Sequence, residues 1–150
     1  MTGGSTEQRG FQHSVFLHLE AVAELLLVHD GDCTQKAYWD LQISCESAYK
    51  ALLVQQTGTF PMSHDLFHLH DACAEGSLSF SRDLLKRVPR WQEMANLRYA
   101  QGTRQILNEC FDCYVTVLDI VAGVLEATKG MRLGNARFEL KTQLPWMRRP

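Results

Sequence analysis

Residues 37–53 read AYWDLQISCESAYKALL, and their apolar members recur every three or four positions. Because an α-helix brings residues three and four apart onto one face, this spacing predicts a helix with a buried stripe. The stripe consists of Ala37, Leu41, Cys45, Ala48 and Leu52. We expect the helix to begin near Asp32 or Thr34 and to end at the turn at residues 57–59.

The same helical spacing recurs on both sides of this segment. The preceding stripe predicts a first helix that Gly31 closes, because glycine readily adopts the left-handed turn at a helix end. Its members are Phe11, Val15, Leu19, Val22 and Leu26. A later stripe predicts a last helix from about Thr103 to Thr128, with Gly130 just beyond it. Its members are Leu107, Cys110, Tyr114, Val117, Val121 and Leu125.

The connection between these helices carries shorter signals. Ser63 suits the N-cap of a short helix, which Gly76 would stop. The apolar positions of that helix are Leu66, Leu69 and Cys73. Ser81 suits the cap of a further segment, and Pro89 should kink or split the helix there because it lacks a backbone N–H. A segment through Trp91, Met94 and Leu97 follows.

No stretch of comparable length alternates between apolar and polar residues, as a strand with one exposed face would. Short connections between long amphipathic helices favour antiparallel neighbours. The sequence therefore predicts an all-α fold, an up-and-down antiparallel bundle of four main helices plus a short helix. We expect residues 1–150 to form a single domain, because this length suffices for one core.

Composition excludes several protein classes. The chain is 45% hydrophobic and 21% charged with a formal net charge of -2, which is typical of a globular domain and not of a disordered or collagen-like chain. It has no run of about 20 apolar residues that could cross a membrane, and Met1–Gly10 is polar where a signal peptide is apolar. Five cysteines, an odd number, lie within apolar patterns, which favours reduced thiols. We therefore expect a cytoplasmic protein without a membrane segment.

Charge is distributed unevenly along the chain. From about Lys129 onward there are six basic residues and one acidic residue, whereas the preceding part has nine basic and sixteen acidic residues. A basic tail on an acidic body attracts nucleic acid, but it can equally pack against its own body or a second subunit. The tail also carries apolar residues, namely Phe138, Leu140, Leu144 and Trp146. Because these residues favour burial, we expect the tail to pack on protein.

Three short elements occur in an order that resembles the HEPN family, named for higher eukaryotes and prokaryotes nucleotide-binding. Residues 44–53, SCESAYKALL, are similar to the family's Ala-x-Glu-x-x-x-Lys-Ala-Leu-Leu run. A glycine turn and Pro61 follow, and residues 63–66, SHDL, then resemble the family's Thr-His-Asp-Leu. Arg98-Tyr99 precedes the last predicted helix, where the family has an Arg-Tyr element. The likeness covers about Ala37 to Glu126.

The resemblance implies an antiparallel helical bundle that is commonly a homodimer and often acts beside a minimal nucleotidyltransferase. Some members are RNA-cleaving toxins that use an Arg followed, after four to six residues, by a His. Here the last histidine is His70, so no arginine from Arg82 onward has a histidine after it. Arg9 precedes His13 by only three intervening residues, so the motif's spacing is absent. The resemblance therefore implies a non-catalytic homodimeric module with a nucleotidyltransferase-type partner.

The two predicted helices before residue 58 carry apolar residues off their main stripes. These residues are Phe16, Leu27, Tyr38, Trp39 and Tyr49. The surplus either completes the core or forms an interface with a second copy of the chain.

Five residues are candidates for binding a nucleotide or RNA: Lys50, His64, Asp65, Arg98 and Tyr99. If Lys50, His64 and Arg98 converge, their charges can hold a phosphate while Tyr99 or Trp39 stacks on a base. The plainer interpretation of Lys50 is a surface ion pair with Glu46, four residues earlier on one helix. No catalytic residue, cofactor or metal is predicted.

Other functions stay open. His64 and His68 have the spacing of zinc-binding helices, so a metal-dependent hydrolase is one alternative. A HEPN-type ribonuclease with unusual residues would use His13 or His64 with Arg9. An antitoxin-like or scaffold protein without a small ligand is the third.

Two further motifs usually have a structural explanation. Cys110 and Cys113 form a Cys-x-x-Cys, but they lie in a predicted helix without a second pair, so we expect burial. The basic residues of the body cluster at Arg82, Lys86, Arg87 and Arg90. Such a cluster is most often a solvated face and less often binds nucleic acid.

Overall fold

The computed structural model describes residues 6–28, 34–90 and 104–128, and within these ranges it contains helices and loops but no strand. The long helices are α1 (Thr6–Val28), α2 (Thr34–Thr57) and α5 (Arg104–Glu126). The shorter elements are the α-helix α3 (Leu66–Ala72) and the 3-10 helix η2 (Arg82–Arg87). The predicted all-α fold is confirmed. The predicted segment through Trp91, Met94 and Leu97 lies outside the described residues.

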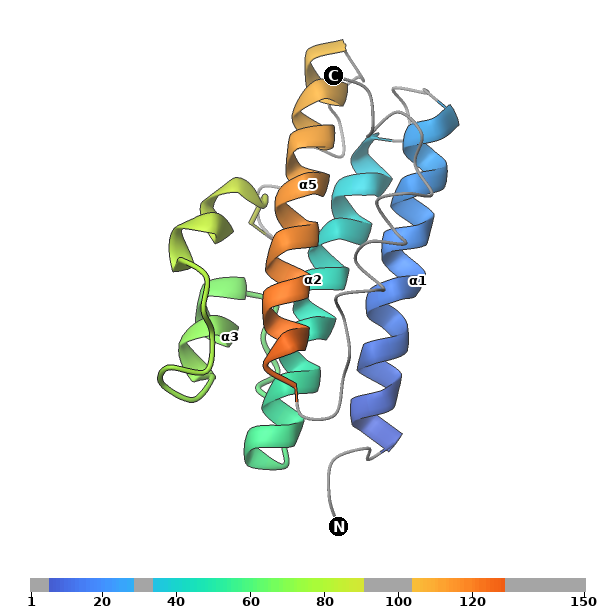
Figure 1. The fold of residues 1–150 in the computed structure, drawn as a ribbon. Helices are drawn as coiled ribbons and strands as arrows, with labels where there is room; N and C mark the ends of the chain where they lie inside the picture. The colour runs from blue at the N-terminus through green and yellow to red at the C-terminus, as the bar shows by residue number, and fades with distance from the viewer. Residues whose placement is uncertain (1–5, 29–33, 91–103, 129–150) are drawn as a thin grey trace.

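The long helices lie side by side, and the shorter elements lie on one flank of the bundle (Figure 1). α1 runs antiparallel to α2, whereas α5 runs in the same direction as α2. α2 is central, because it packs against α1, α5 and α3, while α1 and α5 contact each other only slightly.

α2 is buried on nearly all sides. Its predicted apolar stripe has no exposed surface, and Tyr38 and Tyr49, which lie off the stripe, are also buried. Phe16 and Trp39 are partly buried against the same core. Most of the apolar surplus therefore completes the core of one chain; the side chain of Leu27 lies outside the described part. The buried polar residues of α2 are Asp40, Gln42, Ser44, Ser47 and Lys50.

Buried polar contacts fix the register of α1 on α2. The carboxylate of Asp40, which is 2% exposed, accepts a hydrogen bond from Lys36 Nζ at 2.9 Å and lies 2.8 Å from His18 Nδ1. Ser44 Oγ donates to the backbone oxygen of Val15 at 3.1 Å. Because a buried polar group without a partner costs about 1–3 kcal/mol, these contacts oppose sliding of one helix along the other.

The ends of α2 and the start of η2 agree with the sequence signals. Gly58 follows α2 with a φ of 81°, and its N–H donates to the backbone oxygen of Val54 at 2.8 Å, as is typical of a glycine cap. Ser81 caps η2, since its Oγ accepts from the N–H of Asp83 at 3.2 Å. η2 ends at Arg87, ahead of Pro89, and has the tighter 3-10 winding.

The predicted boundaries of the short helix α3 are wrong by a few residues. The N-cap is Asp65 and not Ser63: the Asp65 carboxylate accepts from the N–H of Phe67 at 3.0 Å. Ser63 Oγ instead accepts from the N–H of Asp65 at 3.1 Å. α3 also ends at Ala72, before Gly76 is reached. Both Ser and Asp are good caps, and the full negative charge of Asp suits the helix dipole better.

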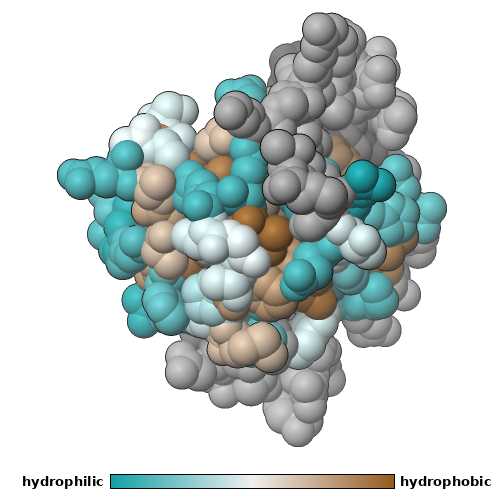
Figure 2. All heavy atoms as spheres, turned by 90° about the horizontal axis from the view of Figure 1, so that it is seen from below, coloured by the Kyte–Doolittle hydropathy of each residue, from teal (hydrophilic) through white to brown (hydrophobic). Residues whose placement is uncertain are grey.

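The surface of the bundle is mixed in character. Figure 2 shows the end of the bundle where α1 begins and α2 ends, and there polar residues (teal) surround a smaller group of apolar residues (brown). Among the described residues, the exposed large apolar side chains are Leu17, Met62 and Val115. None of the described helices is long and apolar enough to cross a lipid bilayer.

Gly123 lets the loop before η2 pack closely on α5. A Cβ added at position 123 would collide with Cδ1 of Phe80 and lie 2.8 Å from its Cε1. The Phe80 ring also packs edge-on against His70, with ring centroids 5.5 Å apart. The ring is therefore held from two sides and has little room to move away.

We expect Gly123→Ala to lower the free energy of unfolding by about 1–3 kcal/mol, the usual cost of overpacking a core, in a urea titration. Gly10→Ala is the matched control in α1, because a Cβ there meets nothing within 4 Å. The control should be neutral, or stabilising by up to about 1 kcal/mol through helix propensity. Equal stabilities of the two variants would show that Phe80 does not pack on Gly123.

Candidate functional site

Lys50 and His64 share the carboxylate of Glu46. Lys50 Nζ donates to Glu46 Oε2 at 3.1 Å, and His64 Nδ1 lies 2.8 Å from Glu46 Oε1. Lys50 Nζ also lies 5.5 Å from the centroid of the Phe60 ring, within range of a cation–π contact. Two of the predicted site residues are thus brought together by a third residue that was expected only to pair with Lys50.

The Glu46–Lys50 pair is nearly buried, in contrast to the surface pair that the sequence suggested. The side chains of Lys50 and Glu46 are 9% and 13% exposed, because the segment after α2, with Phe60 and His64, folds back over them. Glu46 already balances the charge of Lys50. Lys50 is therefore part of an internal ion pair and not an independent anchor for phosphate.

The other predicted site residues are elsewhere. The carboxylate of Asp65 caps α3, as described above, and the residue lines a neighbouring pocket. Arg98 and Tyr99 lie outside the described residues, so their convergence with Lys50 and His64 stays a prediction.

The interpretation of His64 and His68 as a zinc-binding helix is wrong. α3 begins at Leu66, so His64 precedes the helix and cannot share a helical face with His68. Within the described ranges, no three His, Cys, Asp or Glu side chains are grouped closely enough to hold a metal ion. The alternative ribonuclease pair is not buried: Arg9 and His13 are both exposed on α1.

Cys110 and Cys113 are buried in α5, as predicted. Burial disfavours the thiolate, so it raises the pKa of Cys110 to about 12 and that of Cys113 well above its usual 9.0. Cys45 and Cys73 are also buried, and all four described thiols are free. Because the thiolate is the reactive form, none of these cysteines is suited to nucleophilic catalysis.

α3 is fixed to both of its neighbours. Tyr49 of α2 forms a hydrogen bond with His70 Nδ1 at 2.8 Å, and partial burial lowers the pKa of His70. Arg82 of η2 donates two hydrogen bonds of 2.8 Å to Asp71. The paired guanidinium holds the pKa of Asp71 below its usual value. These contacts hold α3 and η2 in place on α2.

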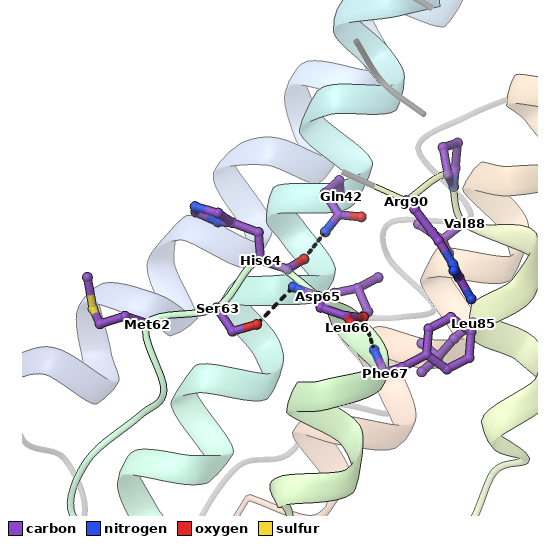
Figure 3. A pocket seen from close by; sticks show the side chains of 11 residues that line it. Gln42, Met62, Ser63, His64, Asp65, Leu66, Phe67, Leu85, Val88 and Arg90 are labelled. Atoms are coloured by element: carbon purple, nitrogen blue, oxygen red, sulfur yellow. Dashed lines mark hydrogen bonds between the residues drawn. The ribbon is translucent and has the colours of Figure 1, made fainter. Parts of the chain in front are cut away.

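A pocket of about 340 Å³ opens between residues 62–67 and residues 85–90 (Figure 3). Its apolar wall includes Leu66, Leu85 and Val88, and its polar groups include Gln42, Asp65 and Arg90. The volume lies at the small end of the range for small-molecule sites, about 300–1,000 Å³.

Gln42 is the unusual member of this pocket. The residue is 1% exposed, and its Nε2 donates to the backbone oxygen of His64 at 2.8 Å. Its Oε1 is buried and has no hydrogen-bond partner. Such an atom costs about 1–3 kcal/mol, so a ligand that donates a hydrogen bond to it would recover a substantial free energy.

Arg90 places a positive charge at the same pocket. Its guanidinium carbon lies 5.2 Å from the centroid of the Phe67 ring, and that of Arg82 lies 4.6 Å from it. Arg82 pairs with Asp71, whereas Arg90 has no carboxylate partner in the described part of the chain. The cluster predicted as a solvated basic face is exposed as expected, and its Arg90 lines this pocket.

A second hollow, of about 550 Å³, lies on the other side of Pro89, between η2 and α5. Lys86 and Arg87 line it together with Glu109 and Asp112, so its charges are of both signs. No unpartnered buried side-chain atom found in the described residues faces it. The second hollow is therefore a weaker candidate for a ligand site than the first pocket.

Sequence reasoning missed Gln42 entirely. A single glutamine within a helix has no recognisable motif, and its environment depends on the segment that folds over α2. Arg90 was noticed only as part of a basic cluster. The one usable signal was the position of Gln42 directly after the buried-stripe residue Leu41. Its contact with His64 joins residues far apart in the sequence, so no local pattern could have indicated it.

We expect Glu46→Gln to lower the free energy of unfolding by about 3 kcal/mol, because it leaves the nearly buried ammonium of Lys50 without its counter-charge. In a Lys50→Met background the same change should cost clearly less, which a double-mutant cycle in urea would measure.

Asp83→Asn is the control for this prediction. It removes the pair of Asp83 with Lys86, whose side chains are 76% and 67% exposed, and it should change stability by less than about 0.5 kcal/mol. If Glu46→Gln were as mild as this control, the ion pair would not be buried in solution.

No known family model matches this chain, and no curated protein or solved structure matches it either.

Proposed function

We propose that this chain is a non-catalytic, cytoplasmic helical module that binds a nucleotide or the end of an RNA in the pocket formed by residues 62–67 and 85–90. The observation that carries the proposal is that two residues of one pocket, Arg90 and Gln42, have unpaired groups among the described residues: a guanidinium without a carboxylate partner and a buried amide oxygen without a hydrogen-bond partner. A nucleotide has the complementary groups, a phosphate and a base with N–H donors.

The shape of the pocket supports a base as the buried part of the ligand. Leu66, Leu85 and Val88 supply an apolar wall, and the guanidinium of Arg90 supplies a planar cation on which a base can stack. The volume of about 340 Å³ suits one base with its sugar and not a longer oligonucleotide. The phosphate would then lie near the exposed Arg90 at the rim.

Absence of catalysis is supported by the way the candidate groups are used. Lys50 and His64 are held by Glu46, and the carboxylate of Asp65 caps α3.

The partner proteins follow from the resemblance to the HEPN family. We propose that the chain forms a homodimer and acts with a nucleotidyltransferase-type protein. The free thiols of the four described cysteines support a reducing, cytoplasmic setting. Leu17, which is 53% exposed on α1, offers apolar surface for a contact with protein.

Calorimetric titration with mononucleotides and with a short single-stranded RNA tests the ligand. We expect saturable binding, weakened at least about tenfold by Arg90→Gln, because a charge-assisted hydrogen bond to phosphate contributes about 1.5–3 kcal/mol. Arg87→Gln is the matched control, since Arg87 is an exposed arginine of η2 that does not line this pocket. If neither ligand binds, or if both variants lose the same affinity, the pocket is not a nucleotide site.

Light scattering on the full chain tests the homodimer. We expect a mass near twice 17.1 kDa at micromolar concentration. A mass of 17.1 kDa at every concentration would contradict the dimer and leave the nucleotide site unaffected.

A further inference from the structure

We infer that the pocket prefers bases that carry an exocyclic amine, because Gln42 presents a fixed hydrogen-bond acceptor inside it. The inference rests on the nucleotide-binding function proposed above and specifies the class of base. Adenine, cytosine and guanine meet this requirement, whereas uracil and hypoxanthine carry oxygen where an amine would be.

The orientation of the Gln42 amide is determined by its neighbour. Nε2 donates to the backbone oxygen of His64, which is only an acceptor, so the oxygen and nitrogen of this amide cannot exchange places without losing that bond. Figure 3 shows Gln42 between His64 and Arg90, with its nitrogen toward His64 and its oxygen toward Arg90. The unpartnered Oε1 is therefore always an acceptor, on a residue that lines the pocket.

The surrounding groups reinforce this preference. The backbone oxygen of His64, which accepts from Gln42 Nε2, and the carboxylate of Asp65, which caps α3, are further acceptors on residues that line the pocket. A base oxygen placed against Gln42 Oε1 would face another acceptor and gain no hydrogen bond. An amine has two N–H groups and can donate to Gln42 and to a neighbouring acceptor at the same time.

The pocket is lined by groups of both kinds, acceptors and a cation. Asp65 and Gln42 attract donors, whereas Arg90 attracts an anion. A nucleoside monophosphate with an amino base has a donor at one end and a phosphate at the other, and the opposite charges of Asp65 and Arg90 leave no excess positive charge to favour a polyphosphate.

Two pairs of probes test the inference, because each pair differs by one amine-to-oxygen exchange. The affinities of AMP and IMP, and those of CMP and UMP, are measured by calorimetry on the full chain. We expect AMP and CMP to bind at least about tenfold more tightly than IMP and UMP, since the exchange replaces the exocyclic donor to Gln42 Oε1 with an acceptor.

Gln42→Met assigns the preference to this side chain. Methionine has a similar length and no amide, so the ratios of AMP to IMP and of CMP to UMP should fall to about one. Ser44→Ala is the control: Ser44 is a buried polar residue of α2 whose Oγ bonds to Val15 of α1, and its loss should leave both ratios unchanged. Thermal unfolding of each variant verifies that it is folded before its ratios are compared.

The outcomes distinguish failure of this base preference from failure of the proposed nucleotide binding. If all four nucleotides bind equally, or if the ratios survive Gln42→Met, the inference is overturned and nucleotide binding stands. If none of the four binds to the folded wild-type chain, both are overturned.

Discussion

Because α2 is enclosed by α1, α5 and α3, the buried polar groups along it need hydrogen-bond partners within the protein. Asp40 and Ser44 find theirs on or beside α1, and Tyr49 finds His70 of α3. These contacts set the register of the bundle and fix the flanking segment that carries α3 and η2. The burial of this helix therefore governs both the fold and the position of the pocket.

The pocket arises where this requirement is incompletely met. Gln42 satisfies the backbone oxygen of His64 and thereby holds the segment before α3, but its own oxygen is left without a partner. Leu85 and Val88 close the other side, and Arg90 follows them at the rim. One amide thus makes a structural hydrogen bond through its nitrogen and has an unpaired acceptor in its oxygen. The other buried polar side chains of α2 have partners, as the ion pair of Lys50 and Glu46 illustrates. The amide of Gln42 is retained for its hydrogen bond to His64, which explains why its unpartnered oxygen persists.

Sequence patterns predicted the candidate site only in part. The i, i+4 spacing of Glu46 and Lys50 correctly predicted their ion pair, since both residues lie on one helix. It could not predict that His64 would join them or that the pair would be nearly buried, because both depend on the chain folding back after Gly58. The spacing of His64 and His68 gave a wrong prediction of a shared helical face for a related reason. Residues four apart lie on one face only when both are in the helix, and α3 starts at Leu66.

The sequence by itself determined the helices, the buried stripes and most of the boundaries, because these depend on local spacing and on caps such as Gly58 and Ser81. The tertiary structure alone decided which polar residues meet. It placed Glu46 between Lys50 and His64, and it set Arg90 beside Phe67. It also left the amide oxygen of Gln42 buried without a partner on a residue that lines the pocket. The physical reason is that periodicity specifies which face of a helix is buried, whereas the neighbour that covers the face comes from a distant part of the chain.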